Sequence, residues 1–307
     1  MRKFLLWMAR NRWLRERVPR LAFVRRSVRR FMPGEELADA LAAAQVNQAI
    51  GVAAVFTRLG ENLVSLDEAQ QVADHYHGAL DAIADTRLDA EISVKLSQLG
   101  YDLDAEAAFG HLDELARHAA AAGTWLWVDM EGSAYVEGTI QLYERVRTAH
   151  SNVGLCLQAY LHRTPADVQR LLPLQPAIRL VKGAYDEPAT IALRTRREVD
   201  AAFLAIASTL APAVRDGTVR FVAATHDVAL LEQLARFHAA LGLAPARTEI
   251  QMLYGIRANE QRRLAARGFT VRCLVAYGEH WYAWYLRRLA ERPANVVFAL
   301  RQILPGS

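Results

Sequence analysis

Residues 91–129 read EISVKLSQLGYDLDAEAAFGHLDELARHAAAAGTWLWVD and contain the repeating unit on which the fold depends. A short apolar run of the β type, 91–94, is followed by a helical pattern over 104–122. That pattern begins at Asp104, a residue type common at helix N-caps. A second apolar run follows at 125–129. Strand, helix and strand in this order predict two parallel strands joined by a crossover helix.

The same alternation extends over most of the chain. The predicted strands lie at 51–56, 91–94, 125–129, 154–157, 178–181, 219–223, 248–252 and 270–275. The predicted helices lie at 35–48, 65–84, 104–122, 138–150, 164–172, 187–216, 227–241, 259–267 and 278–291, several starting with an N-cap type residue such as Ser65, Thr164 or Asp227. Eight strand–helix units match the closure number of the TIM-type (β/α)8 barrel, so we predict this α/β fold. A doubly wound sheet is the alternative, but no GxGxxG or GxxxxGK[ST] loop follows a predicted strand.

Length and composition agree with a single large barrel. The chain has 307 residues, 52% of them hydrophobic, and no uncharged apolar run reaches the roughly 18 residues of a membrane span. We divide it into an N-terminal helical arm, 1–48, and a barrel, 49–307. Cys156 and Cys273 belong to no CxxC pair and are expected to be buried free thiols. They indicate a reducing, cytoplasmic compartment.

The positive net charge is concentrated in the arm. Residues 1–32 contain eleven Lys or Arg and the single acid Glu16, while the remainder of the chain is acidic. One interpretation is an amphipathic helix at the inner face of an anionic membrane. The other is a helical arm that packs on the body of the protein or on a partner subunit. Nucleic acid is not expected as a partner, because no DNA- or RNA-binding motif accompanies the charge.

In a (β/α)8 barrel, catalytic groups come from the C-terminal ends of the strands. Lys95 ends the second predicted strand and Asp129 the third. A buried lysine needs a carboxylate nearby, and Asp129 on the neighbouring strand is the obvious candidate. The pair indicates either a structural ion pair or the charged floor of a substrate pocket.

Further polar groups collect at the same rim. The segment 179–185, RLVKGAY, places Arg179 and Lys182 near one strand end, and Gly183 would let backbone N–H groups approach a ligand. Thr225 and His226 follow the next strand and suit a phosphate or ribose. The histidines form no recognisable metal-binding set, so no metal is expected.

The last predicted helix, within 277–291, has five aromatic residues before Arg287 and Arg288, with Glu291 three residues further on. An arginine pair on an aromatic face can bind a carboxylate through paired hydrogen bonds. A surface helix with Arg–Glu pairs would have the same pattern. Together, the rim residues suggest a barrel enzyme that binds an anionic cofactor and a small carboxylate.

Seven segments, in order, resemble the flavin-dependent proline dehydrogenases, most closely the short monofunctional bacterial form. They are 93–100, 127–131, 157–161, 179–185, 224–227, 251–255 and 287–291, and the resemblance runs from about residue 34 to residue 301. It implies a distorted (β/α)8 barrel that binds FAD non-covalently. It also implies oxidation of L-proline to Δ1-pyrroline-5-carboxylate, with the electrons passed to a quinone.

The resemblance also implies roles for individual residues. The implied substrate-binding residues are Lys95, Tyr185, Leu253, Arg287, Arg288 and Glu291. Asp129 would hold Lys95 in place and Arg179 would lie near the flavin N5, which makes these two the implied catalytic residues. The implied FAD-binding residues are Met130, Gln158, Lys182, Gly183, Ala184, Thr225 and His226.

Two departures from the family pattern concern the substrate pocket. Leu274 replaces a tyrosine of the usual Tyr-x-Pro-Tyr-Gly run, and Trp284 replaces a second pocket tyrosine. Losing a phenol removes a hydrogen bond and frees volume. The alternatives to proline are therefore another cyclic imino acid or amine, such as hydroxyproline, pipecolate or an intermediate of secondary metabolism. A catalytically silent flavin-binding protein is a further alternative.

Overall fold

The structure is a computed structural model that describes residues 11, 17–18, 22–60, 63–282 and 284–286. Eight parallel strands form a closed barrel in sequence order, as predicted. The strands are β1 (Val52–Arg58), β2 (Ala90–Lys95), β3 (Leu126–Asp129), β4 (Val153–Gln158), β5 (Ala177–Val181), β6 (Arg220–Ala224), β7 (Glu249–Leu253) and β8 (Thr270–Tyr277).

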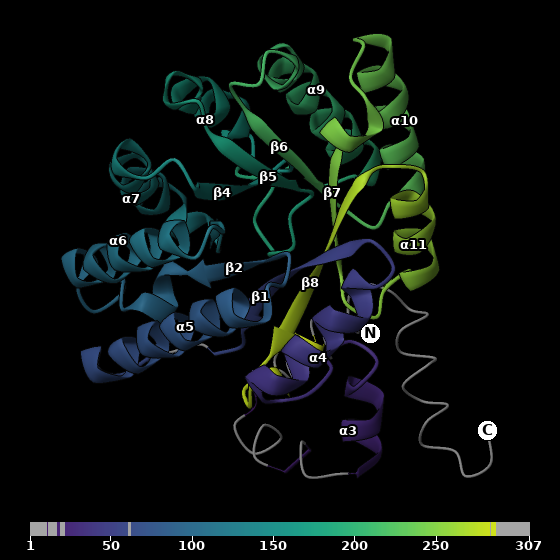
Figure 1. The fold of residues 1–307 in the computed structure, drawn as a ribbon. Helices are drawn as coiled ribbons and strands as arrows, with labels where there is room; N and C mark the ends of the chain where they lie inside the picture. The colour runs from purple at the N-terminus through teal and green to yellow at the C-terminus, as the bar shows by residue number, and fades with distance from the viewer. Residues whose placement is uncertain (1–10, 12–16, 19–21, 61–62, 283, 287–307) are drawn as a thin grey trace.

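Helices cover the outside of the barrel (Figure 1). They are α3 (Ala22–Val28), α4 (Leu37–Gln48), α5 (Leu66–Thr86), α6 (Ala105–Ala121), α7 (Val136–Ala149), α8 (Thr164–Leu171), α9 (Arg196–Arg215), α10 (Val228–Ala240) and α11 (Ala258–Ala266). Residues 281–282 and 284–286 are also helical. The short 3-10 helices are η2 (Leu96–Leu99), η3 (Ser133–Tyr135), η4 (Leu172–Leu174) and η5 (Pro245–Arg247).

The helix starts agree with the predicted N-caps in most places. Ser65, Asp104 and Asp227 each accept hydrogen bonds from backbone N–H groups of the first turn. Thr164 was wrongly expected to be a cap. It is already helical, Arg163 occupies the cap position, and the Thr164 hydroxyl donates instead to the Gln158 carbonyl at 2.6 Å.

Helix α9 starts nine residues later than the predicted start at 187. Its N-cap is Thr195, which forms a capping box with Glu198. The preceding residues form a loop, because Leu161 and Ala192 make an isolated antiparallel bridge and the His162 N–H donates to the Ile191 carbonyl. These bonds hold the loop after β5 against the loop after β4 at the C-terminal rim.

The barrel interior has three levels. The lowest is ionic: Arg220 and Arg272 pair with Glu91 and Glu249. The middle level is apolar and consists of Val55, Trp127, Ala177 and Val222, with Leu274 packed against them. The highest level is polar and contains the candidate site. Leu274 therefore lies inside the barrel, where a tyrosine in its place would present a phenol.

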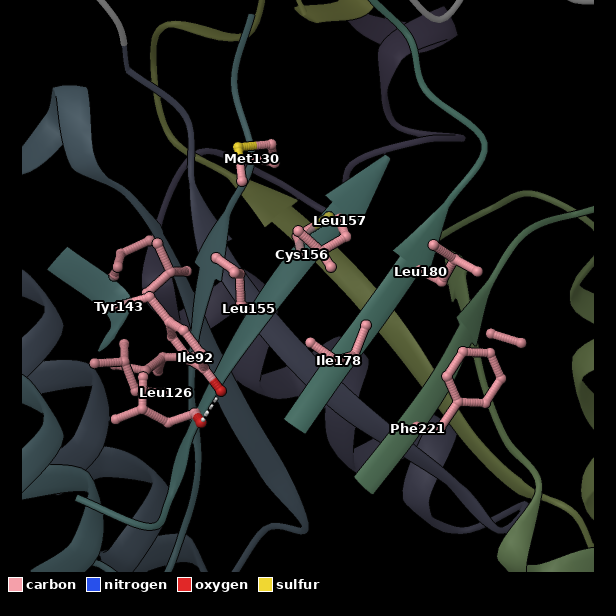
Figure 2. Close-up of a cluster of buried hydrophobic side chains, with 14 of the residues drawn as sticks. Ile92, Leu126, Met130, Tyr143, Leu155, Cys156, Leu157, Ile178, Leu180 and Phe221 are labelled. Atoms are coloured by element: carbon pink, nitrogen blue, oxygen red, sulfur yellow. Dashed lines mark hydrogen bonds between the residues drawn. The ribbon is translucent and has the colours of Figure 1, made fainter. Parts of the chain in front are cut away.

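The main apolar core lies between the strands and the surrounding helices. Figure 2 shows part of it, where Leu155, Ile178 and Leu180 of neighbouring strands pack with Tyr143 of α7 and Phe221 of β6. Each of these side chains is at most 3% exposed. Complete burial of large apolar side chains contributes roughly 1.5–3 kcal/mol each. This core holds the strands rigidly beneath the rim.

The described part of the arm packs on the body. Val24, Val28 and Phe31 are buried in one apolar cluster with Trp281 and Tyr285 of the last helix. The alternative that the arm packs on the body therefore holds for this stretch. Residues 1–10, 12–16 and 19–21 lie outside the described residues. No helix in the described ranges is both long and apolar enough to cross a membrane.

Candidate active site at the C-terminal rim

The predicted site residues gather at one end of the barrel. Lys95, Asp129, Gln158 and Leu253 are the last residues of β2, β3, β4 and β7. Met130, Lys182, Gly183, Ala184, Tyr185, Thr225 and His226 follow strand ends, and Arg179 lies inside β5. Arg287, Arg288 and Glu291 lie outside the described residues, so the predicted clamp is not placed by the structure.

Arg179 is the centre of the described site. It is 2% exposed, and its guanidinium contacts side chains from three other strands. Nη2 donates to the Ser93 hydroxyl at 2.7 Å and to the Asp129 carboxylate, and Nη1 donates to Gln251 Oε1 at 3.3 Å. Its Cζ lies 5.1 Å from the centre of the Trp127 ring. Because a buried guanidinium is costly unless it is paired, these contacts fix its position.

Lys95 and Asp129, which were expected to interact, are register partners at the ends of adjacent strands. The ion pair between Asp129 and Arg179 was not predicted.

Glu131, two residues after Asp129, accepts from the Ser97 N–H at 3.1 Å and from the Ser97 hydroxyl at 2.7 Å. Burial raises the pKa of the Glu131 carboxyl, against the lowering effect of these bonds and of Lys95. The rim thus holds two carboxylates in different environments.

Gln158 presents a buried acceptor that has no partner within the described chain. Its Nε2 donates to the carbonyls of Met130 and Glu131, at 3.2 Å and 3.0 Å, while Oε1 has no hydrogen-bond partner there. Buried polar atoms are normally hydrogen-bonded, so this oxygen indicates a ligand with a donor group. The imide N–H of a flavin ring is such a donor.

Gly183 forms a cradle at the end of β5. Its φ is 114°, and a Cβ at this position would lie 2.2 Å from the Tyr160 ring. Only glycine fits there, and its lack of a side chain lets backbone N–H groups reach an anion. Together with Gln158, this cradle fits the flavin nucleotide that the family resemblance implies.

The charge of Lys182 is offset within the protein. Its Nζ pairs with Asp200 and Asp227, the latter at 2.8 Å. Burial works to raise the pKa of the Asp227 carboxyl, but bonds from Lys182 and Arg196 outweigh it and hold the pKa at about 2. Lys182 therefore orders the loop around Asp227 and is a weaker anion ligand than its charge suggests.

Thr225 and His226 lie beside this network. The Thr225 hydroxyl accepts from the Asp227 N–H at 3.2 Å, and its own hydrogen can still be donated to a ligand. His226 Nε2 accepts from the Leu253 N–H at 3.5 Å, and in the tautomer that this bond favours Nδ1 carries the proton. Both side chains can therefore donate to phosphate or hydroxyl oxygens.

The loop after β5 is also tied to the loop after β3. Glu187 accepts from the Ser133 N–H and from the Ser133 hydroxyl, each at 2.7 Å. Tyr185 lies in this tied loop and is 38% exposed. A Cβ on Gly132 would lie 4.0 Å from the Tyr185 ring. This tie places Tyr185 over the rim, where it can border a substrate pocket.

Ser93, Trp127 and Gln251 were missed as site residues. The signal for them was present in the strand alternation: each lies two residues before a predicted site residue, Lys95, Asp129 or Leu253, and so faces the same side. A buried arginine inside β5 should have prompted a search for its partners at these positions. Among the described residues, no group of three or more His, Cys, Asp or Glu could hold a metal ion.

The fold and the site define a (β/α)8-barrel enzyme whose C-terminal rim can hold an anionic cofactor above a buried guanidinium–carboxylate pair. The model of the proline dehydrogenase family matches residues 40–301. The chain is 34% identical to proline dehydrogenase 1 of Bacillus subtilis strain 168 over 307 residues, which is 99% of both chains. It is also 34% identical to proline dehydrogenase of Deinococcus radiodurans, over 90% of both chains.

The chain therefore belongs to the proline dehydrogenase family, whose members are flavin-dependent oxidoreductases. Solved structures agree on the fold. Proline utilization A from Bdellovibrio bacteriovorus, inactivated by N-propargylglycine, has a TM-score of 0.80 at 22% identity and matches 87% of this chain. The Bradyrhizobium japonicum D779W mutant has a TM-score of 0.71. This chain spans about a third of the length of these larger proteins, 33% and 30% respectively.

Proposed function

We propose that this member of the family uses FAD to oxidise L-proline to Δ1-pyrroline-5-carboxylate. The observation that carries the proposal is the Arg179 guanidinium, buried at the C-terminal rim and held by Asp129, Ser93 and Gln251. A fixed positive charge at this place would stabilise the negative charge of a reduced flavin. The family membership supports the same reaction.

FAD fits the described rim. Gln158 Oε1 would accept from the flavin ring, while Gly183, Ala184, Thr225 and His226 would donate to the rest of the cofactor. Met130, 6% exposed, would pack against it. When bound, the flavin would accept a hydride from the substrate carbon next to the nitrogen, while the nitrogen loses a proton and a carbon–nitrogen double bond forms.

The chain's own residues would orient the substrate. Lys95, at the end of β2, would bind the proline carboxylate together with Arg287 and Arg288, and Glu291 would orient the two arginines. Asp129 lies beside Lys95 in register and would keep the lysine directed toward the substrate. Leu253 and Tyr185 would border the ring of the substrate. Holding the reacting carbon in one orientation is the main contribution such groups can make.

The experiment is an absorbance spectrum of the purified protein, followed by anaerobic addition of L-proline. Flavin bands that bleach are the expected result, and the released cofactor should be identified as FAD by chromatography. The Lys95→Met variant should take up FAD normally but be reduced at least about 100-fold more slowly, because it lacks the orienting charge. Arg263→Gln, which removes an exposed charge on the outer helix α11, should behave as wild type.

The other outcomes are equally informative. Bands that bleach only with hydroxyproline or pipecolate would show that the substrate is a different cyclic imino acid. The Leu274 and Trp284 changes would then account for the altered substrate choice. Bands that bleach with none of these would support the silent flavin-binding protein. A colourless protein that takes up no added FAD would contradict the proposed cofactor and reaction together.

We further propose that a membrane quinone is the electron acceptor and that the arm brings the enzyme to the anionic inner face of the membrane. Arg26, Arg29 and Arg30 are exposed on the outer side of the packed arm. Flotation with anionic vesicles should recover the full chain, and neutral vesicles or higher salt should release it. Equal flotation with neutral and anionic vesicles would contradict an electrostatic contact.

A further inference from the structure

A cavity of about 340 Å³ lies at the end of the barrel opposite the candidate active site, where β5, β6 and β7 begin. Arg147, Arg220 and Arg247 line it, together with Trp125 and Glu249. Among the described residues that line it, Glu249 is the only one with a carboxylate. The wall of this cavity, which we call the lower cavity, therefore has three guanidinium groups and one carboxylate.

The Glu249 carboxylate is already hydrogen-bonded to two arginines. It accepts from Arg220 at 2.7 Å and 2.9 Å, and from Arg272 at 3.1 Å. Arg220 also donates to Glu91 at 2.6 Å. Even so, Arg220 Nη1 is buried and has no hydrogen-bond partner within the described chain. This atom has almost no surface open to the cavity, and the guanidinium lies against the Trp125 and Trp127 rings, 4.5 Å and 5.1 Å from their centres. Arg220 therefore contributes to the wall of the cavity, and its charge is balanced by the two carboxylates.

The other two guanidinium groups bond to main-chain carbonyls. Arg147 donates to four carbonyls: those of Val153, Gln175 and Leu174, at 3.2 Å, 2.5 Å and 3.4 Å, and that of Ser151. Arg247 donates to the Val214 carbonyl at 2.5 Å. These bonds hold the side chains in place but do not neutralise them. Within the part of the chain that the structure describes, neither pairs with a carboxylate. The lower cavity thus keeps a net positive charge.

We propose that the lower cavity binds a small oxyanion of the phosphate or carboxylate class. Arg247 supplies the hydrogen bonds, because within the described chain only its Nη2 is bonded, and a guanidinium group matches the geometry of two neighbouring oxyanion oxygens. The cavity is roomy enough for such an ion and several waters, each of which takes about 30 Å³.

This site is separate from proline oxidation. In barrel enzymes the N-terminal end of the strands normally contributes to stability, and the active site occupies the opposite rim. The oxyanion is therefore a ligand that binds the folded barrel, and it should stabilise that state by mass action. The effect would be present whether or not the proposed reaction is correct.

Isothermal titration of inorganic phosphate into the full-length protein, at constant ionic strength, tests the proposal. Binding is expected both with and without saturating FAD, since phosphate at the opposite rim would be blocked by the cofactor. The thermal midpoint should also rise with phosphate. Arg247→Gln should weaken phosphate binding at least fivefold, while its amide can still donate to the Val214 carbonyl. Arg263→Gln, the same charge change on α11, should bind as wild type.

Two results would overturn the proposal. One is the absence of binding heat and of a thermal shift with both phosphate and succinate in the wild-type protein. The other is equal phosphate affinity in wild type, Arg247→Gln and the charge-reversed Arg247→Glu. Binding that FAD abolishes and Arg247→Gln leaves unchanged would place the anion at the cofactor rim and would also contradict the lower site.

Discussion

The hydroxyl groups of Ser27 and Tyr285 are hydrogen-bonded at 2.5 Å although the residues are 258 positions apart in the sequence. Ser27 belongs to α3, and Tyr285 to the helical turn that precedes Arg287 and Arg288. A second bond joins the same two segments, because Trp281 Nε1 donates to the Glu35 carboxylate at 2.8 Å. The N-terminal segment thus holds the start of the helix that would carry the arginine pair.

Removing one partner of this bond should destabilise the protein. Ser27→Ala leaves the hydroxyl of Tyr285, a residue that is 3% exposed, without its partner. The expected loss is about 1–3 kcal/mol in the free energy of unfolding, measured by denaturant titration. Replacing both partners, as in Ser27→Ala with Tyr285→Phe, should recover much of this loss because no unpaired buried hydroxyl remains.

The double variant is the control for this effect. If its destabilisation equals the sum of the two single changes, the hydrogen bond contributes nothing and the single effects come from lost packing. Under the proposed function, Ser27→Ala should also raise the KM for proline more than it lowers kcat, since the bond positions the clamp and takes no part in the chemistry.

Loss of the Asp129–Arg179 ion pair should lower the free energy of unfolding more than loss of the Ser93 hydroxyl, which contacts the same guanidinium. Asp129→Asn leaves Arg179 buried without a carboxylate, and breaking such a pair costs about 3–5 kcal/mol. Ser93→Ala removes one hydrogen bond to the same guanidinium, at about 1.5–3 kcal/mol. Because Asp129 is 20% exposed, we expect the low end of its range. Denaturant unfolding of the flavin-free protein measures both.

A larger loss in Ser93→Ala than in Asp129→Asn would contradict the assignment of Asp129 as the main partner of Arg179. Gln251→Leu is a matched comparison within the same network. Its Oε1 accepts from Arg179 at 3.3 Å, a longer bond, so the smallest of the three effects is expected.

The barrel was predictable because its strands are buried on both faces. Such strands appear in a sequence as short apolar runs, and every predicted strand end lies within two residues of the observed one. Strand ends then fix the rim, so the positions of Lys95, Asp129 and Lys182 followed from the fold rule alone. The local signals were sufficient because they repeat eight times.

Long-range contacts account for what the sequence did not predict. The late start of α9 reflects contacts with distant segments, namely the Leu161–Ala192 bridge and the Glu187–Ser133 hydrogen bonds, which keep the loop after β5 out of the helix. The Thr195–Glu198 capping box was a visible signal for the true start. The Arg179 contacts to Ser93 and Gln251 join strands from different parts of the barrel. No local sequence pattern predicts which of the side chains that face the barrel interior contact one another.

The stability of the protein should depend on the protonation of His75. Burial, and then the charge of Arg58, lower the pKa of His75 from 6.5 to about 4. Between these values the unfolded chain binds a proton that the folded protein excludes, so the free energy of unfolding falls as pH drops from 6.5 to 4. His75 is only half-buried, and after allowance for solvent screening we expect a contribution of about 1–2 kcal/mol.

Comparison with His75→Gln isolates this effect from the titration of carboxylates. The glutamine amide can replace the bond of His75 Nε2 to the Tyr277 hydroxyl, which is 2.8 Å long. Denaturant unfolding at pH 7.5 and pH 5 should show a smaller loss of stability in the variant than in the wild type. Equal losses in the two proteins would mean that His75 takes up its proton equally well in the folded state.

Gly183 should be required for flavin binding because it has no side chain, and not only because it adopts a positive φ. Gly183→Ala meets two obstacles: a φ of 114° and a Cβ that would lie 2.2 Å from the Tyr160 ring. Gly242→Ala meets only the first, since its φ is 79° and no atom lies within 4 Å of its Cβ. The pair of variants therefore separates backbone strain from the clash at the cradle.

Both alanine variants should lose about 1–2 kcal/mol of stability from the positive φ. Only Gly183→Ala should also weaken FAD binding, by at least about tenfold, because relief of the clash moves either the Tyr160 ring or the turn that supplies backbone donors. Flavin fluorescence during titration of the flavin-free protein measures the affinity, and denaturant unfolding measures the stability. If FAD affinity falls equally in both variants, the loss follows general destabilisation, and Gly183 is not part of the cofactor site.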